Sequence, residues 1–276
     1  MTYILIIISI VVLSYLLYIA NQNTKDIKIN KISIPASNST NNPTISILHL
    51  SDLHLENISI TPNELANKIN NQTFDIIALT GDFLDRKRTI PKLVPYLEVL
   101  QKSNPKYGIY AVLGNHDYVL KGNNLIQLKQ TLSNYDCHVL QNESRTIKAN
   151  GQTVNIIGID DYSTNRSNLA LSYQKVKSGL NLVLTHDPNV VLEMSDYHFD
   201  YLLAGHFHGG QICYPKAYHL VKMGTLARKN IIKGLHMHNN NPFYISEGLG
   251  QTGVNIRVGS RPEITFHDIS LEKKNA

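Results

Sequence analysis

The chain of 276 residues is 42% apolar and 17% charged, and its formal net charge is +5. This length fits one large domain or two small ones, and the apolar content excludes a wholly disordered chain. Cys137 and Cys213 have no CxxC spacing, which excludes a disulfide framework and a cysteine-built zinc site. We expect two reduced thiols, and a single long-range disulfide is the alternative.

Residues 3–20 form an apolar segment, and no charged side chain stands before Lys25. As an α-helix, such a segment rises about 27 Å, close to the hydrocarbon thickness of a bilayer. A cleavable signal peptide is the alternative, but this segment has neither a basic start nor a small-residue cleavage site. We therefore predict a transmembrane anchor over residues 1–22.

The cations that follow this segment, Lys25, Lys28 and Lys31, predict its orientation. By the positive-inside rule, the anchor would lie in the inner (cytoplasmic) membrane with the remaining chain in the cytoplasm. The extracytoplasmic side is the alternative, because the free amino terminus carries an opposing charge.

Residues 23–44 are rich in Asn, Ser, Thr and Lys, a composition that predicts a linker between the anchor and a catalytic domain over residues 45–276. Within this linker, residues 27–34 alternate between apolar and polar side chains, which predicts an edge strand.

Short apolar runs then alternate with helical patterns, which predicts an α/β fold. The predicted strands cover residues 45–50, 75–79, 109–113, 154–159, 180–185 and 201–204, and the predicted helices cover 62–70, 91–103 and 125–134. From about residue 242 onward, strands follow without intervening helices.

Most of these strands end at polar residues, as at the active sites of α/β proteins. In chain order these are Asp52 with His54, Asp82, Asn115 with His116, His186, and His206 with His208. Carboxylate, amide and imidazole groups together suit Mn²⁺, Fe or Zn²⁺. One four-coordinate ion cannot use so many ligands, whereas two ions sharing a carboxylate can.

These blocks read DxH, GD, GNHD, a lone H and GHxH, and in this order they resemble the calcineurin-like metallophosphoesterases. The resemblance covers residues 45–270, and the words GHFHGGQ, SEGLG and RPEI resemble the membrane-anchored bacterial branch of that family. It implies a four-layer α/β/β/α sandwich, here preceded by one transmembrane helix.

The resemblance also implies two divalent metal ions. Mn²⁺ is favoured, with Fe, Zn²⁺ or Mg²⁺ as alternatives. Asp52, His54 and His208 would hold the first ion, and Asn115, His186 and His206 would hold the second. Asp82 would bridge them.

Two further residues take catalytic roles by the same resemblance. His116 would face the phosphate and protonate the leaving oxygen, and Asp85 would orient the His116 ring. A hydroxide bridging the two metals would attack phosphorus. Asp117 would support the site without binding metal.

The implied activity is hydrolysis of a phosphodiester or pyrophosphate. With an anchor and membrane lipid nearby, UDP-2,3-diacylglucosamine of lipid A synthesis is our specific candidate. The alternative is another phosphoester of the membrane or cell envelope. A nuclease or a non-catalytic metal-binding scaffold fits less well, and we expect no nucleic acid partner.

Several residues that resemble metal ligands or a binding surface fall outside the motifs. We expect His236 and His238 in an exposed loop, and Asp160 and Asp161 without metal. The basic residues between 216 and 233 predict either a solvated face or a flap resting on anionic lipid. The apolar side chains interleaved with them are Tyr214, Tyr218, Leu220, Val221 and Met223.

Overall fold

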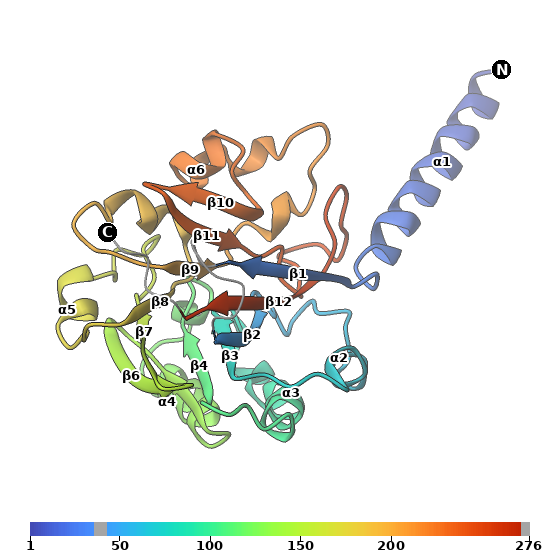
Figure 1. The fold of residues 1–276 in the computed structure, drawn as a ribbon. Coiled ribbons are helices and arrows are strands. Elements are labelled where there is room, and N and C mark those ends of the chain that lie inside the picture. Colours follow the sequence, from blue (N-terminus) through green and yellow to red (C-terminus); the bar gives the residue numbers. More distant parts are fainter. Residues whose placement is uncertain (36–42, 272–276) are drawn as a thin grey trace.

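The computed structural model describes residues 1–35 and 43–271, which form two six-stranded sheets and the helices around them (Figure 1). The first sheet has the order β1 (Lys28–Ile34), β12 (Glu263–Ser270), β2 (Thr44–Leu50), β3 (Ile76–Thr80), β4 (Ile109–Val112) and β5 (Cys137–Val139). The second has the order β10 (Gly234–His238), β11 (Asn241–Ile245), β9 (Tyr201–Ala204), β8 (Leu180–Leu184), β7 (Gln152–Gly158) and β6 (Glu143–Ala149).

The strands at the centre of each sheet run parallel to one another. Strands β2 to β5 are parallel in the first sheet, and β7, β8, β9 and β11 are parallel in the second. Their carboxyl ends therefore meet along one edge of each sheet, where α/β proteins place their active sites.

Three separate hydrophobic cores divide the molecule into four layers. Alternate residues of β2 serve two of them, because Leu48 and Leu50 pack toward α2, α3 and α4, whereas Ile45 and Ile47 pack between the sheets. The third core lies on the outer face of the second sheet and contains Leu202 of β9. This arrangement is the α/β/β/α sandwich that the family resemblance implies, and it confirms the α/β fold that the strand and helix patterns predict.

The helices are short apart from the first. Their bounds are α1 (Thr2–Gln22), α2 (Pro62–Ile69), α3 (Ile90–Lys102), α4 (Asn123–Ser133), α5 (Leu169–Tyr173) and α6 (Thr225–Arg228). The 3₁₀ helices are η1 (Lys87–Thr89), η2 (Asp117–Val119), η3 (Pro188–Glu193), η4 (His208–Gly210) and η5 (Tyr218–Met223). A capping box joins Thr61 and Glu64 at the start of α2, which explains where that helix begins.

Helix α1 projects away from the sandwich (Figure 1). Within the described residues it is the one helix long and apolar enough to cross a membrane, a test that a signal sequence would also pass. The strand predicted at 27–34 is β1, which pairs in parallel with β12 at the edge of the first sheet. Parts of the predicted linker and domain, residues 36–42 and 272–276, lie outside the described residues.

The exposed loop predicted around His236 and His238 is wrong. Both residues lie on β10, which forms an antiparallel hairpin with β11, and Asn239 and Asn240 turn the chain with positive φ angles of 48° and 63°. Consecutive residues with positive φ give the turn that hairpins favour, so the asparagines mark a hairpin turn. Cys137 and Cys213 are free thiols, as predicted.

Candidate metal centre

Polar side chains from both sheets meet at the carboxyl ends of five strands. Asp52 and His54 follow β2, Asp82 follows β3, and Asn115 and His116 follow β4. His186 follows β8 in the second sheet, and His206 and His208 follow β9. All the predicted metal ligands except Asn115 fall into groups of three whose ligand atoms lie within 4.8 Å of one another, and we call these metal-sized groups.

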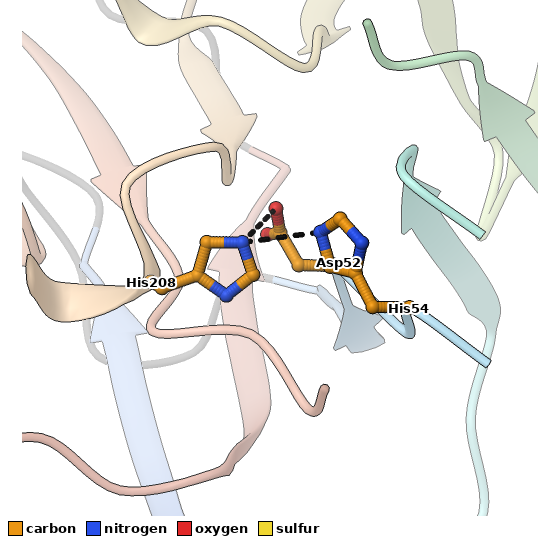
Figure 2. A group of neighbouring side chains, drawn as sticks. All are labelled: Asp52, His54 and His208. Atoms are coloured by element: carbon orange, nitrogen blue, oxygen red, sulfur yellow. Dashed lines mark hydrogen bonds and ion pairs between the residues drawn. The ribbon is translucent and has the colours of Figure 1, made fainter. Parts of the chain in front are cut away.

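The first group consists of Asp52, His54 and His208 (Figure 2). His208 Nε2 lies 3.4 Å from Asp52 Oδ1 and 3.1 Å from His54 Nε2. All three side chains are buried, and they come from loops more than 150 positions apart in the chain.

The second group consists of Asp82, His186 and His206. His186 Nε2 lies 3.1 Å from Asp82 Oδ2 and 3.1 Å from His206 Nδ1. The same Asp82 oxygen lies 3.4 Å from His54 Nε2 in the first group. The Asp82 carboxylate therefore lies next to histidines of both groups.

Hydrogen bonds to backbone carbonyls set the orientation of two imidazole rings. His186 Nδ1 donates to the Thr80 carbonyl at 2.7 Å, and His208 Nδ1 donates to the Gly250 carbonyl at 3.2 Å. Because Nδ1 is committed to a carbonyl, each ring turns its Nε2 atom into the centre. Two imidazole nitrogens facing each other at 3.1 Å need a cation or a proton between them, so these residues fit metal ions.

The electrostatics of the buried carboxylates lead to the same conclusion. Asp52 and Asp82 are buried, and their nearest ionic partners are the histidines of the two groups. Burial opposes ionisation, but His186 and His54 hold the pKa of the Asp82 carboxyl well below its usual value. Burial lowers the pKa of His208 to about 3, which keeps its imidazole neutral, as metal ligation requires.

Asn115 lies beside these groups and lines the same cavity of about 450 Å³ as Asp82, His116 and His206. Its side-chain Oδ1 is buried without a hydrogen-bond partner. An unpaired buried amide oxygen is costly unless something binds it, so this atom fits a ligand of a cation.

His116 and Asp85 are neighbours without a hydrogen bond. His116 Nδ1 lies 3.8 Å from Asp85 Oδ2, a distance too long for a hydrogen bond. His116 also forms a third metal-sized group with His54 and Asp82, so it is placed to bind a metal as well as to donate a proton. The catalytic roles of both residues stay predictions.

Asp117 organises the loops that carry the candidate ligands. Its buried carboxylate accepts hydrogen bonds from the backbone N–H groups of Asp82 and Gly114 at 2.9 Å. It also accepts from the N–H groups of Phe83 and Leu84. The side chain is therefore committed to the backbone of both loops and belongs to none of the metal-sized groups, as the sequence suggests.

Two glycines of the motifs leave room for the carboxylates. A Cβ atom at Gly114 would collide with the Asp82 side chain, and one at Gly205 would collide with Ser51 and Asp52. Five candidate ligands themselves adopt positive φ angles, namely Asp52, His54, Asp82, His206 and His208. Left-handed backbone in residues other than glycine is strained, and such strain concentrates at functional sites.

The residues that the sequence places outside the metal-binding motifs make other contacts. Asp160 accepts a hydrogen bond from Tyr118 Oη, and Asp161 accepts from the N–H group and hydroxyl of Thr164. Neither belongs to a metal-sized group among the described residues. Leu220, predicted on a lipid-facing flap, packs into the third core.

Sequence reasoning assigned no role to Arg257, whose side chain is fully buried. Its guanidinium donates to the carbonyls of Glu247, Gly248 and Gly250 at 2.8–3.0 Å. The Gly250 carbonyl is the acceptor for His208 Nδ1, so Arg257 supports a candidate ligand from behind. No local pattern signals this role, because it depends on the folded path of residues 247–257.

Residues 45–210 match the family described as calcineurin-like phosphoesterase. The chain belongs to this family. A metallophosphoesterase of Bacillus subtilis named YkoQ and described as uncharacterised is 62% identical, over 96% of this chain and 99% of its own length.

More distant family members carry names that state an activity. The UDP-2,3-diacylglucosamine pyrophosphatase LpxG of Chlamydia trachomatis is 26% identical over 80% of this chain and 82% of its own length. The phosphodiesterase YaeI of Escherichia coli is 26% identical over 81% of each chain. The calcineurin-like phosphoesterases are metal-dependent, so this chain is a metal-dependent phosphoric ester hydrolase.

Proposed function

We propose that this protein is a membrane-anchored hydrolase that uses two metal ions to cleave a phosphodiester or pyrophosphate bond. The observation that carries the proposal is the position of Asp82, whose Oδ2 lies within 3.4 Å of one group of candidate ligands and 3.1 Å of the other. A carboxylate shared in this way is what a pair of ions needs.

In this proposal Asp52, His54 and His208 hold one ion, and Asn115, His186 and His206 hold the other. Asp82 contacts both. When bound, two cations would neutralise the phosphoester and lower the pKa of a water molecule that attacks phosphorus. Mn²⁺ is the proposed ion, because mixed carboxylate, amide and imidazole ligands suit it; Fe, Zn²⁺ and Mg²⁺ are the alternatives to be assayed.

The protein's own contribution to bond cleavage comes from His116. Its half-exposed side chain lines the cavity beside Asp82, and its backbone N–H group donates to Asp82 Oδ1 at 2.8 Å. A ring held there can give a proton to the leaving oxygen. Asp85, 3.8 Å away, would orient the ring once substrate draws the two together.

Helix α1 supplies the proposed anchor, with residues 1–22 in the membrane, 23–44 as a linker and 45–276 as the catalytic domain. Its length and apolar composition fit a bilayer. Lys25, Lys28 and Lys31 follow it, which favours an inner membrane location with the catalytic domain in the cytoplasm. The extracytoplasmic orientation is the alternative.

The proposed substrate class is a membrane-resident phosphoester, with UDP-2,3-diacylglucosamine of lipid A synthesis as the specific candidate. The similarity to LpxG and the anchor support this nucleotide-linked glycolipid. The similarity to YaeI supports the alternative, a phosphodiester of another membrane or envelope compound.

Hydrolysis by the detergent-solubilised, metal-stripped protein tests both the proposed metal-dependent chemistry and the proposed glycolipid substrate. Mn²⁺, Mg²⁺, Zn²⁺ or Fe²⁺ would be added back with UDP-2,3-diacylglucosamine or bis-p-nitrophenyl phosphate. We expect metal-dependent release of UMP from the first substrate. Cleavage of the second alone would overturn the glycolipid assignment and keep the diesterase, whereas no metal-dependent cleavage of either would overturn the proposed chemistry.

A further inference from the structure

The carboxyl end of α1 is hydrogen-bonded to a loop of the active-site pocket. Arg257 N donates to the Ala20 carbonyl at 2.8 Å. The side-chain amides of Asn21 and Asn23 donate to the carbonyls of Asn255 and Arg257, each at 2.8 Å. These three bonds fix the point at which α1 leaves the domain.

The same loop forms part of the pocket wall. Thr252, Gly253 and Val254 line the cavity that contains the candidate metal ligands. Gln211 Nε2 donates to the carbonyls of Thr252 and Val254 at 3.0 and 3.1 Å, which ties the loop to the segment after His208. The end of α1 therefore contacts the loop that forms the pocket wall, and this loop contacts the segment after His208.

Exposed apolar side chains stand on this loop and on the segment after His208, and we call them the apolar rim: Ile212, Tyr214, Tyr218, Val221 and Val254. Ile212 and Val254 line the pocket, and the other three lie within two positions of a lining residue in the chain. Tyr214 is 83% exposed, Tyr218 65% and Val254 58%. Lys216 and Lys222 are exposed between them. Single apolar side chains on a surface are ordinary, but a cluster around one opening indicates an interaction surface.

The two segments that carry the apolar rim lie on the side of the domain from which α1 projects. In Figure 1 the orange segment that contains residues 212–223 and the red loop before β12 both rise on that side. Helix α4 lies on the opposite side. A bilayer that holds α1 would therefore face these two segments, which both contribute residues to the pocket wall.

We propose that the apolar rim rests in the lipid surface that holds α1, so that the metal pocket opens toward the membrane. This inference rests on the proposed anchor. Tyrosine rings favour the interface between hydrocarbon and headgroups, and Lys216 and Lys222 would meet anionic headgroups there. The phosphoester of a lipid substrate could then enter the pocket while its acyl chains stay in the bilayer.

Single tryptophan probes can test this geometry, because the chain contains no Trp. The full-length protein would be reconstituted into vesicles of phosphatidylcholine and phosphatidylglycerol, with bromine atoms near the top of the acyl chains as quenchers. The rim probes are Tyr214→Trp and Tyr218→Trp. Tyr15→Trp reports on α1, and Ile126→Trp, 56% exposed on α4, is the matched control away from the membrane.

We expect brominated lipid to quench both rim probes at least about twofold more than Ile126→Trp, as expected for side chains that reach the boundary of headgroups and acyl chains. Tyr15→Trp should also be quenched. Turnover of bis-p-nitrophenyl phosphate by each variant checks that the domain is folded.

Two results would overturn the inference, and they are distinguishable. If Tyr15→Trp is quenched while the rim probes behave like Ile126→Trp, the anchor stands and the docking of the rim is wrong. If neither Tyr15→Trp nor the rim probes are quenched, the proposed anchor fails and the docking fails with it.

Discussion

The carboxylate of Asp82 stands between two groups of histidines, and its charge is the feature that both groups share. The change Asp82→Asn keeps the shape of the side chain and removes the charge. We expect the metal content to fall from about two ions per chain to less than one, and activity to fall with it. Elemental analysis of the purified protein measures the metal content.

The matched control for this change is Asp161→Asn. Asp161 is also buried after a central strand, but it accepts hydrogen bonds from Ser163 and Thr164 and lies outside the metal-sized groups. This variant should keep its metal. Full metal content and full activity in Asp82→Asn would contradict the two-metal assignment.

A substitution at His116 distinguishes proton donation from metal binding. We expect His116→Ala to keep both ions and to lower kcat by about 100- to 10,000-fold, the usual contribution of a positioned acid or base. Metal analysis and steady-state kinetics with bis-p-nitrophenyl phosphate measure the two effects. Loss of metal would instead make His116 a ligand, through the group it forms with His54 and Asp82.

At this scale the sequence predicts that the motif residues come together. The motif residues stand directly after apolar runs, so their convergence follows from the parallel strands. The relation between His116 and Asp85 could not be predicted as well, because a distance of 3.8 Å depends on the path of a loop. The support that Arg257 gives to His208 depends in the same way on residues far apart in the chain.

The segment between β11 and β12 acts as one structural element around Arg257. Replacing this side chain by lysine leaves one ammonium to serve several buried carbonyls. Each carbonyl left without a partner costs about 1–3 kcal/mol, so we expect Arg257→Lys to lower the free energy of unfolding by about 3 kcal/mol. Thermal unfolding in detergent measures the loss.

The control for this prediction is Arg261→Lys, in which a partly exposed guanidinium pairs with the exposed Asp26. Exposed ion pairs contribute little, so this variant should unfold close to the parent temperature. If Arg257→Lys unfolds at that temperature too and binds metal equally well, the proposed support of His208 is wrong.

The elements themselves were predictable where the pattern was periodic. Alternating apolar and polar residues predict β1, and helical patterns predict α2 to α4. The hairpin strand β10 was missed, because His236 and His238 break the apolar pattern on a strand that is only half covered. Residues 208–228 form short 3₁₀ and α turns whose positions depend on packing against the second sheet.

The whole molecule brings its two sheets together at the candidate metal centre. Asp52, His54 and Asp82 come from the first sheet, whereas His186, His206 and His208 come from the second. Each group therefore contains residues from both sheets, and a bound ion would link them. Without a cation, the facing imidazole nitrogens repel one another unless a proton lies between them, and the buried carboxylates then depend on protonated histidines for their stability.

Metal removal should therefore lower the stability of the entire domain. An ion at a thousand times its Kd stabilises the folded state by about 4 kcal/mol, which corresponds to roughly 10 °C in Tm for a chain of this size. We expect chelation to lower the Tm of the detergent-solubilised protein by this amount and Mn²⁺ to restore it. Asp82→Asn should show no such response, because it lacks the carboxylate that both groups share. An unchanged Tm in the parent protein after complete metal removal would contradict a link between the sheets through bound ions.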